Sequence, residues 1–186
     1  MTAGNRYGRG RDKSPRKSIF KGLIIAVLIF LSAVIQTTDI IKIFGSTPAI
    51  TFALVCAAGF ICGERVGAVI GIFAGVVTDA LGASGVTLTI LLYTICGYMC
   101  GAMVDWFLST NFPSFLVYAA LAGLIREGVT LIYLTLMSQK IPLGEAVLGL
   151  MLPEFFAYLV CAIPAYFAVF GIDKIFKVKD KRGYRV

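Results

Sequence analysis

The sequence predicts an all-α, polytopic membrane bundle of about six transmembrane helices, and its composition and segment lengths carry this prediction. Hydrophobic residues make up 59% of the 186 residues, charged residues only 15%, and the mean hydropathy is +0.90. A soluble globular domain carries roughly 25% charged residues. The composition therefore excludes a soluble enzyme, a disordered chain and a disulfide-built secreted module. Residues 19–172 leave room for about six helical crossings of about 20 residues each.

Two basic tails flank the apolar region and predict its orientation. The formal net charge is +7; seven of the 17 Lys and Arg residues lie in the first 21 positions and six in the last 14. Positive charge beside membrane segments marks the cytoplasmic side. We therefore expect cytoplasmic tails at 1–18 and 173–186, in contact with anionic lipid, around a six-helix domain at 19–172. Nucleic-acid binding is not expected, because no basic face alternates with aromatic residues.

Six apolar runs follow one another with short polar links between them. In chain order they cover residues 19–35, 49–62, 66–81, 86–108, 114–137 and 146–172. The first run is about one membrane thickness long and is followed by no clear small-x-small cleavage pattern, so it is interpreted as a retained anchor. The second run has only 14 residues. A helix of that length spans about 21 Å, so it must pack among other helices where the membrane is thinned, or be re-entrant.

The links between the runs favour six crossings over four. Gly63-Glu64-Arg65 predicts a turn after the second run, and the glycines of residues 82–85 predict another after the third. An even number of crossings places both basic tails on one side, and four would do so too. However, burying the breaks at Glu64-Arg65 and at 111–113 in lipid would leave polar groups unsatisfied.

Glycines recur every four residues in the third and fourth runs. The series are Gly67, Gly71 and Gly75, followed by Asp79, and then Gly97 and Gly101, followed by Asp105. Residues four apart share one helix face, and glycine there allows another backbone to approach closely. The spacing favours packing of the third helix against the fourth, with a homo-oligomer or partner-subunit face as the alternative.

Four charged residues fall near the middle of the apolar runs, where a charge costs about 2.5–3.5 kcal/mol. At 1.5 Å per residue, Asp79 and Arg126 each lie about 18 Å from the inner side, and Glu154 lies about 12 Å from the outer side. In a hydrocarbon core about 30 Å thick these depths coincide. We therefore predict an intramembrane polar layer that consists of Asp79, Arg126, Glu127 and Glu154, whereas Asp105 falls near the inner surface.

The partners of Arg126 follow from its position on the helix. Neighbouring residues point about 100° apart, so Arg126 and Glu127 are not expected to pair well, and Arg126 should bond Glu154 or Asp79 on another helix. Three carboxyls against one guanidinium leave surplus negative charge, so at least one of them is expected to be protonated at neutral pH. The layer either clamps the third, fifth and sixth helices together, or lines a ligand cavity or contacts a partner's helix.

Catalytic, metal and cofactor chemistry is not expected. The chain has no histidine, and its five cysteines lie in apolar runs without a C-x-x-C pair, which excludes a Cys/His zinc site. Neither a nucleophile-elbow pattern nor a glycine-rich phosphate loop with lysine occurs. The sequence therefore predicts a protein that is not an enzyme and holds no cofactor.

The stretch from Gly67 to Gly101 resembles the rod shape-determining protein MreD family of bacteria. The resemblance rests on Gly71-x3-Gly75-x3-Asp79, on the turn at 82–85, and on the passage Leu91-Leu92-Tyr93…Gly97-Tyr98-x-x-Gly101. It implies a non-enzymatic, multi-pass component of the bacterial cytoplasmic membrane, within the elongation machinery that builds the lateral peptidoglycan wall and maintains cell shape. The partners that it implies are a bitopic MreC-like protein, the MreB filament and the wall synthases.

The same resemblance keeps a second function open. The family looks similar in fold to the six-helix substrate-binding components of energy-coupling-factor transporters, so a small-molecule-binding membrane subunit is the alternative. A carrier requires an outward-open pocket lined by Asp79, Arg126, Glu127 or Glu154. A scaffold requires a central cavity that is small or filled by side chains. The outer links carry few aromatic and polar residues, which favours the scaffold.

Overall fold

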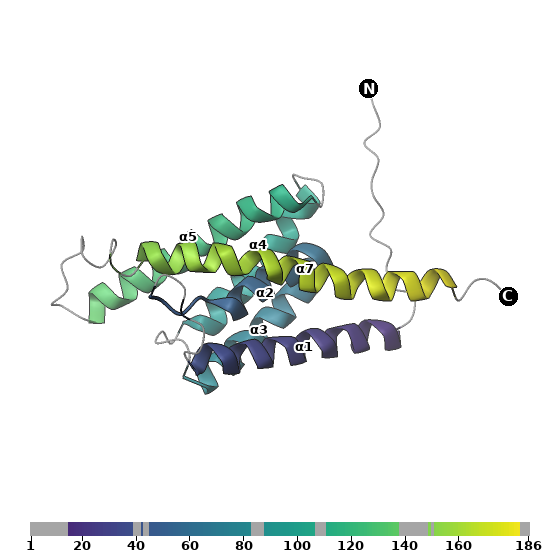
Figure 1. The fold of residues 1–186 in the computed structure, drawn as a ribbon, viewed down its shortest axis with the longest axis horizontal. Helices are drawn as coiled ribbons and strands as arrows, with labels where there is room; N and C mark the ends of the chain where they lie inside the picture. Colours follow the sequence, from purple (N-terminus) through teal and green to yellow (C-terminus); the bar gives the residue numbers. More distant parts are fainter. Residues whose placement is uncertain are drawn as a thin grey trace, which may run out of the picture.

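The structure, a computed structural model, has six α-helices among its described residues (Figure 1). It describes residues 15–38, 42, 45–82, 88–106, 111–137, 149 and 151–182. The helices are α1 (Pro15–Thr37), α2 (Ile50–Cys62), α3 (Glu64–Ala80), α4 (Thr89–Trp106), α5 (Phe112–Met137) and α7 (Leu152–Arg182). The predicted all-α fold class is confirmed.

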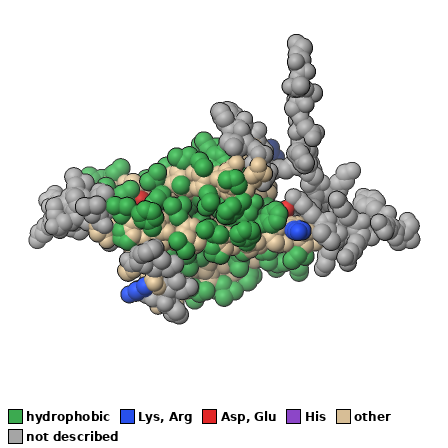
Figure 2. Space-filling model, turned by 45° about the horizontal axis from the view of Figure 1, so that its top comes forward, with side chains coloured by type: hydrophobic (Ala, Val, Ile, Leu, Met, Phe, Trp, Pro, Cys, Tyr) green, Lys and Arg blue, Asp and Glu red, His purple; other side chains and the backbone are tan. Residues whose placement is uncertain are grey.

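Three of the helices are long and apolar enough to cross a membrane. The qualifying segments are Phe20–Thr37 in α1, Phe112–Tyr133 in α5 and Leu152–Phe176 in α7. Helices α2 and α4 are apolar but shorter. Hydrophobic side chains cover most of the face in Figure 2. Such an extended apolar surface exceeds what soluble monomers normally expose, so the helix lengths and the surface both fit a helical membrane protein.

The start of α1 and the end of α7 lie at the same end of the bundle (Figure 1). Lys21 near the start of α1 forms an ion pair of 2.5 Å with Asp173 near the end of α7. Cys62, the last residue of α2, lies beside Lys21, and α3 begins two residues later. We call this the basic end, because Lys21, Lys174 and the exposed Arg65 all belong to it.

Helix α2 occupies the centre of the bundle. All its residues from 51 to 61 are buried, and it packs against α1, α3, α4, α5 and α7. A helix enclosed by its neighbours needs no length matched to a lipid layer, which explains how a 13-residue helix is accommodated. The expected packing of the short second run among other helices is confirmed.

Gly63 alone reverses the chain between α2 and α3. Its φ is 105°, which L side chains rarely adopt, and its N–H donates to the carbonyl of Gly59 at 2.9 Å. The predicted three-residue turn Gly63-Glu64-Arg65 is therefore wrong in length, since α3 begins at Glu64 rather than at Val66. A glycine that closes one helix and opens the next makes the reversal without further link residues.

Helices α3 and α4 pack backbone to backbone along the predicted glycine series. A Cβ at any of the five positions would lie under 3.0 Å from a backbone atom of the facing helix. The facing residues are Gly97 for Gly67, Tyr93 for Gly71, Ile90 for Gly75, Gly67 for Gly97, and Glu64 for Gly101. The shared face is thus buried within the chain, which leaves these glycines unavailable to a second copy or a partner.

Aromatic side chains fill the space between α2, α5 and α7. Phe60 on α2 contacts Phe115 and Tyr118 on α5 and Tyr166 on α7, with ring centroids 5.5, 5.9 and 6.3 Å away. Tyr166 also lies 4.9 Å from Phe115. These rings supply large buried apolar area with defined geometry, so they fix α5 and α7 against the central helix.

The first and last helices extend beyond the predicted membrane domain. Helix α1 begins at Pro15, a residue suited to the first helical position, and α7 continues to Arg182. The expected tail boundaries at residues 18 and 173 are therefore not helix ends. Lysine and arginine favour helix, so α7 continues where the basic residues begin. It also passes through Pro164 without a break.

Candidate functional site

One guanidinium joins two carboxylates in the apolar interior of the bundle. Arg126 Nη2 lies 2.8 Å from Glu154 Oε1, and Arg126 Nη1 bonds Glu127 Oε1. The side chains of Arg126, Glu127 and Glu154 are 14%, 3% and 17% exposed. We call these three residues the charged centre. It ties α5, which supplies Arg126 and Glu127, to α7, which supplies Glu154.

The pairing within the charged centre agrees only in part with the sequence-based expectation. Arg126 bonds Glu154 on another helix, as its predicted depth requires. The expectation that Arg126 and Glu127 cannot pair is wrong, because they form an ion pair. The 100° angle between neighbours applies to their Cβ directions. The long apolar stem of arginine allows its guanidinium to turn back along the helix.

Side chains from two further helices, α2 and α4, lie beside the charged centre. The Phe52 ring on α2 lies with its centroid 6.0 Å from Arg126 Cζ, within the range of a cation–π interaction. Tyr93 on α4 lies close enough to interact electrostatically with Arg126 and Glu154, and it hydrogen-bonds with the buried Thr78 on α3. The charged centre therefore has neighbours on α2 and α4 as well as on its own helices, and Tyr93 connects it to Thr78 on α3.

The other two predicted carboxylates lie on α3 and α4. Asp79 is half-buried in the last turn of α3, directly after Thr78, and makes an interaction of its own. Asp105 lies in the last turn of α4, with its side chain outside the described residues. Among the four residues of the predicted polar layer, the structure joins Arg126, Glu127 and Glu154 by ion pairs.

Sequence reasoning missed the aromatic neighbours of the charged centre. Phe52 contacts Tyr93 and Tyr158 at centroid distances of 5.1 and 5.5 Å, and Tyr158 donates a hydrogen bond of 3.0 Å to the carbonyl of Ala119. One available signal was the position of Tyr93, four residues before Gly97, which places it on the glycine face of α4. Phe52 and Tyr158 carry no comparable signal, because aromatic residues recur throughout the apolar runs.

A second ion pair lies at the basic end. The side chains of Lys21 and Asp173 are 13% and 9% exposed, and the rings of Phe20 and Phe176 lie 6.2 Å apart beside them. Sequence reasoning used Lys21 only as one of the seven basic residues in the first 21 positions. Its pairing with Asp173 depends on the return of α7 alongside α1, which no local pattern predicts.

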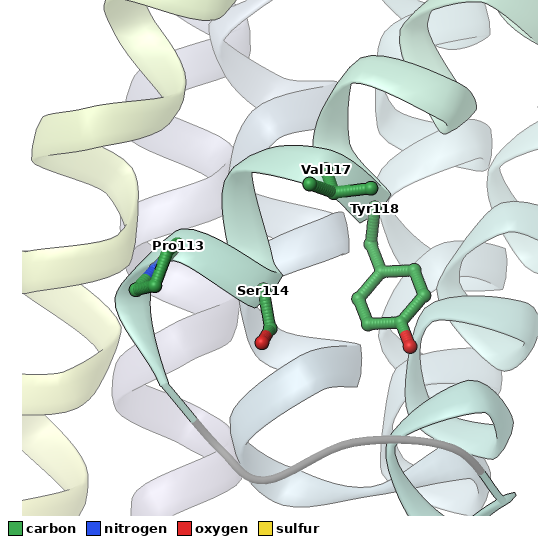
Figure 3. Close-up of a pocket in the computed structure, with 4 residues that line it drawn as sticks. All are labelled: Pro113, Ser114, Val117 and Tyr118. Atoms are coloured by element: carbon green, nitrogen blue, oxygen red, sulfur yellow. The ribbon is translucent and has the colours of Figure 1, made fainter.

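A small apolar pocket opens at the start of α5 (Figure 3). It has a volume of about 240 Å³ and is lined by Pro113, Ser114, Val117 and Tyr118. These residues occupy the first two turns of α5, whereas Arg126 lies two turns further along the same helix. None of these four described lining residues is charged, and none belongs to the residues predicted to line the pocket of a carrier.

The chemistry available at the charged centre is ion pairing and proton binding. Its groups are two carboxylates and a guanidinium, with a phenol nearby and no cysteine or serine side chain in the ion-paired set. Within the described residues, no three His, Cys, Asp or Glu side chains converge in a way that could hold a metal ion. The arrangement can join helices and can exchange a proton.

The fold and the site together fit a helical membrane protein. It is an all-helical bundle with an apolar outer surface, three helices long enough to cross a membrane, and an ion-paired centre between α5 and α7. No model of a known protein family, no curated protein and no solved structure matches the chain. The function is therefore inferred from the bundle and from the residues that carry the resemblance.

Proposed function

We propose that this protein is a non-enzymatic, multi-pass membrane scaffold of the bacterial elongation complex, similar to the MreD family. In this proposal all six helices cross the cytoplasmic membrane, or pack within it in the case of α2, and both termini are cytoplasmic. The protein holds the wall-building machinery together and contributes to rod shape. The resemblance in residues 67–101 suggests the family, and the structure supplies the physical support given below.

The course of the chain supports an even number of crossings. The pairing of Lys21 with Asp173 requires that the chain enter and leave the bundle at the same end. The exposed Arg65 and Lys174 belong to that end as well. Positive charge beside membrane segments favours the cytoplasmic side, so the basic end is the cytoplasmic end in our proposal.

The central position of α2 is the observation that favours a scaffold over a small-molecule carrier. A small-molecule carrier needs a concave site of about 300–1,000 Å³ between its helices. Here the middle of the bundle holds a helix whose residues 51–61 are all buried. Arg126, the cation that would meet an anionic ligand, is already bonded to Glu127 and Glu154. These features favour a protein that presents surfaces to other proteins over one that encloses a ligand.

The proposed partners follow from the resemblance and from the apolar surface. A bitopic MreC-like protein would contact the bundle within the membrane, and the MreB filament and wall synthases would join the larger complex. The bundle exposes apolar side chains on every helix except α2, among them Val69 on α3, Leu91 on α4 and Val117 on α5. Such faces can accept either lipid or a partner's transmembrane helix.

Depletion followed by microscopy tests the proposed function. In the rod-shaped cell that encodes this protein, depletion should make cells wide and then round, and re-expression of the wild-type chain should restore rods. The matched control is re-expression of Lys42→Ala, which changes one exposed lysine and should also restore rods. Cells that stay rod-shaped after complete depletion would rule out the scaffold role.

Two further measurements separate the scaffold from the carrier. Purification from mild detergent should recover an MreC-like bitopic protein together with this chain. Native mass spectrometry of the purified chain should show no bound metabolite that survives the removal of lipid. A stoichiometric metabolite together with an unchanged cell shape on depletion would favour the carrier instead.

A further inference from the structure

The charged centre contains two carboxyl groups and one guanidinium. Glu127 and Glu154 bind the two terminal nitrogens of the same guanidinium, so ionisation of both carboxyls gives the centre a net charge of −1. At most 17% of any of these side chains is exposed. A charge without a counter-ion is strongly disfavoured in such surroundings, and the cheapest remedy is the binding of one proton.

We propose that the carboxyl pair of Glu127 and Glu154 binds one exchangeable proton, and that the bound proton stabilises the packing of α5 against α7. With the proton bound, one carboxylate balances Arg126 and the second carboxyl is neutral. Without the proton, the two carboxylates repel each other beside a single guanidinium. This inference does not depend on a role in cell elongation, because it rests only on the residues of the bundle.

Among the described residues, the groups shown beside the carboxyl pair offer no second positive charge. Helix α7 contributes Tyr158, α4 contributes Tyr93, and α2 contributes the ring of Phe52. Helix α3 contributes Thr78 through its hydrogen bond with Tyr93, and Asp79, the next residue of α3, is a carboxylate rather than a cation. Helix α1 places its Lys21 at the basic end, bonded to Asp173. Among these groups, Arg126 is therefore the only cation.

Because the two carboxyl groups lie on different helices, the bound proton affects the packing between those helices. Glu127 belongs to α5 and Glu154 to α7, so repulsion between them acts across the joint between the two helices. The folded protein then binds the proton more readily than the unfolded chain, whose carboxyls are solvated. Stability is consequently highest at low pH and falls as pH rises through the loss of this proton. A glutamine at either position imitates the protonated carboxyl and should remove this dependence.

Thermal unfolding of the full chain in nanodiscs of uncharged lipid tests the proposal. The melting temperature should fall by several degrees as pH rises through the loss of the proton. Glu127→Gln, Glu154→Gln or both should show a flat profile over that range. The matched control, Glu64→Gln, makes the same substitution at the basic end and should keep the wild-type slope. A wild-type profile that is flat, or a slope retained in both centre variants, would overturn the proposal.

Infrared spectroscopy provides a readout that does not require the variants to be stable. The folded wild-type protein should show the carbonyl stretch of a buried, protonated carboxylic acid, which shifts in heavy water and disappears at high pH. In whichever of Glu127→Gln and Glu154→Gln folds, this band should be lost or displaced, and Glu64→Gln should retain it. Absence of the band at every pH at which the wild-type protein is folded would contradict the proposal.

Discussion

Arg126 on α5 and Glu154 on α7 are joined by an ion pair of 2.8 Å between two helices that pack side by side. Their side chains are only 14% and 17% exposed, so water screens the pair weakly. The Phe52 ring and the ion-paired Glu127 are also neighbours of the guanidinium. The pair therefore stabilises the α5–α7 interface more than an exposed surface pair would.

Removal of Arg126 should destabilise the protein more than removal of any exposed lysine. Arg126→Ala leaves Glu127 and Glu154 without their counter-ion, and breaking a buried pair in this way costs about 3–5 kcal/mol. Lys42→Ala, at an exposed position, should change the free energy of unfolding by no more than about 0.5 kcal/mol. Reversible unfolding in mixed micelles measures both values. Equal values would show that the charged centre does not hold the helices.

A double-mutant cycle separates the Arg126–Glu154 contact from other effects of the substitutions. Glu154→Ala alone leaves Arg126 paired with Glu127, so it should cost less than Arg126→Ala. The double variant Arg126→Ala/Glu154→Ala should lose less free energy of unfolding than the sum of the single variants, by about 0.5–3 kcal/mol. Strict additivity would mean that the 2.8 Å contact contributes no coupling.

Gly97 and Gly128 form a matched pair for testing the glycine packing of α3 and α4. Both glycines are helical, but a Cβ at Gly97 would lie 2.5 Å from the carbonyl oxygen of Gly67, whereas at Gly128 nothing lies within 4 Å. Gly97→Ala should therefore force the helices apart and cost about 1–3 kcal/mol. Gly128→Ala should be neutral or stabilising by up to about 1 kcal/mol, because alanine favours helix. Denaturant titration of the two variants should rank them in this order.

Much of the fold could be predicted from the sequence because long apolar runs and basic tails can be recognised from residues that are adjacent in the chain. Each described helix overlaps one predicted run, and the glycine spacing in 67–101 predicts the α3–α4 contact, since residues four apart always share a helix face. The central position of α2 could not be predicted. It depends on which neighbours surround a short apolar helix, and lipid and protein surroundings select similar side chains.

The sequence predicts which charged residues form the charged centre, but it does not predict all of their contacts. Depth along the helix brings Arg126 and Glu154 to the same layer, because rise per residue is constant. The bond between Arg126 and Glu127 depends on the rotamer of a long side chain, which spacing does not specify. The approach of Phe52 and Tyr93 depends on packing between helices. Lys21 and Asp173 also meet only through tertiary structure, since they lie near opposite ends of the chain.

Gly63 should tolerate no other residue, in contrast to Gly82. Gly63 has a φ of 105°, outside the small left-handed region open to other residues, whereas the φ of 67° at Gly82 lies within it. Gly63→Asn should therefore cost about 1–3 kcal/mol, as strained backbone positions do. Gly82→Asn should cost less, because asparagine adopts the left-handed conformation comparatively easily. Comparison of their unfolding free energies measures the difference, and equal costs would contradict the role of Gly63 as the reversal point.

Charge reversal at Lys21 and Asp173 should be destabilising singly and largely neutral when combined. Lys21→Asp places two carboxylates together where α1 meets α7, and Asp173→Lys places two ammonium groups there. Each change should cost about 3–5 kcal/mol, as the loss of a buried pair does, because the two side chains are only 13% and 9% exposed. The double variant Lys21→Asp/Asp173→Lys restores opposite charges at the same 2.5 Å contact and should recover most of the lost free energy. Proteolysis of the chain in nanodiscs measures the opening of this end, and failure of the double variant to regain protection would show that α1 and α7 are held by their apolar contacts alone.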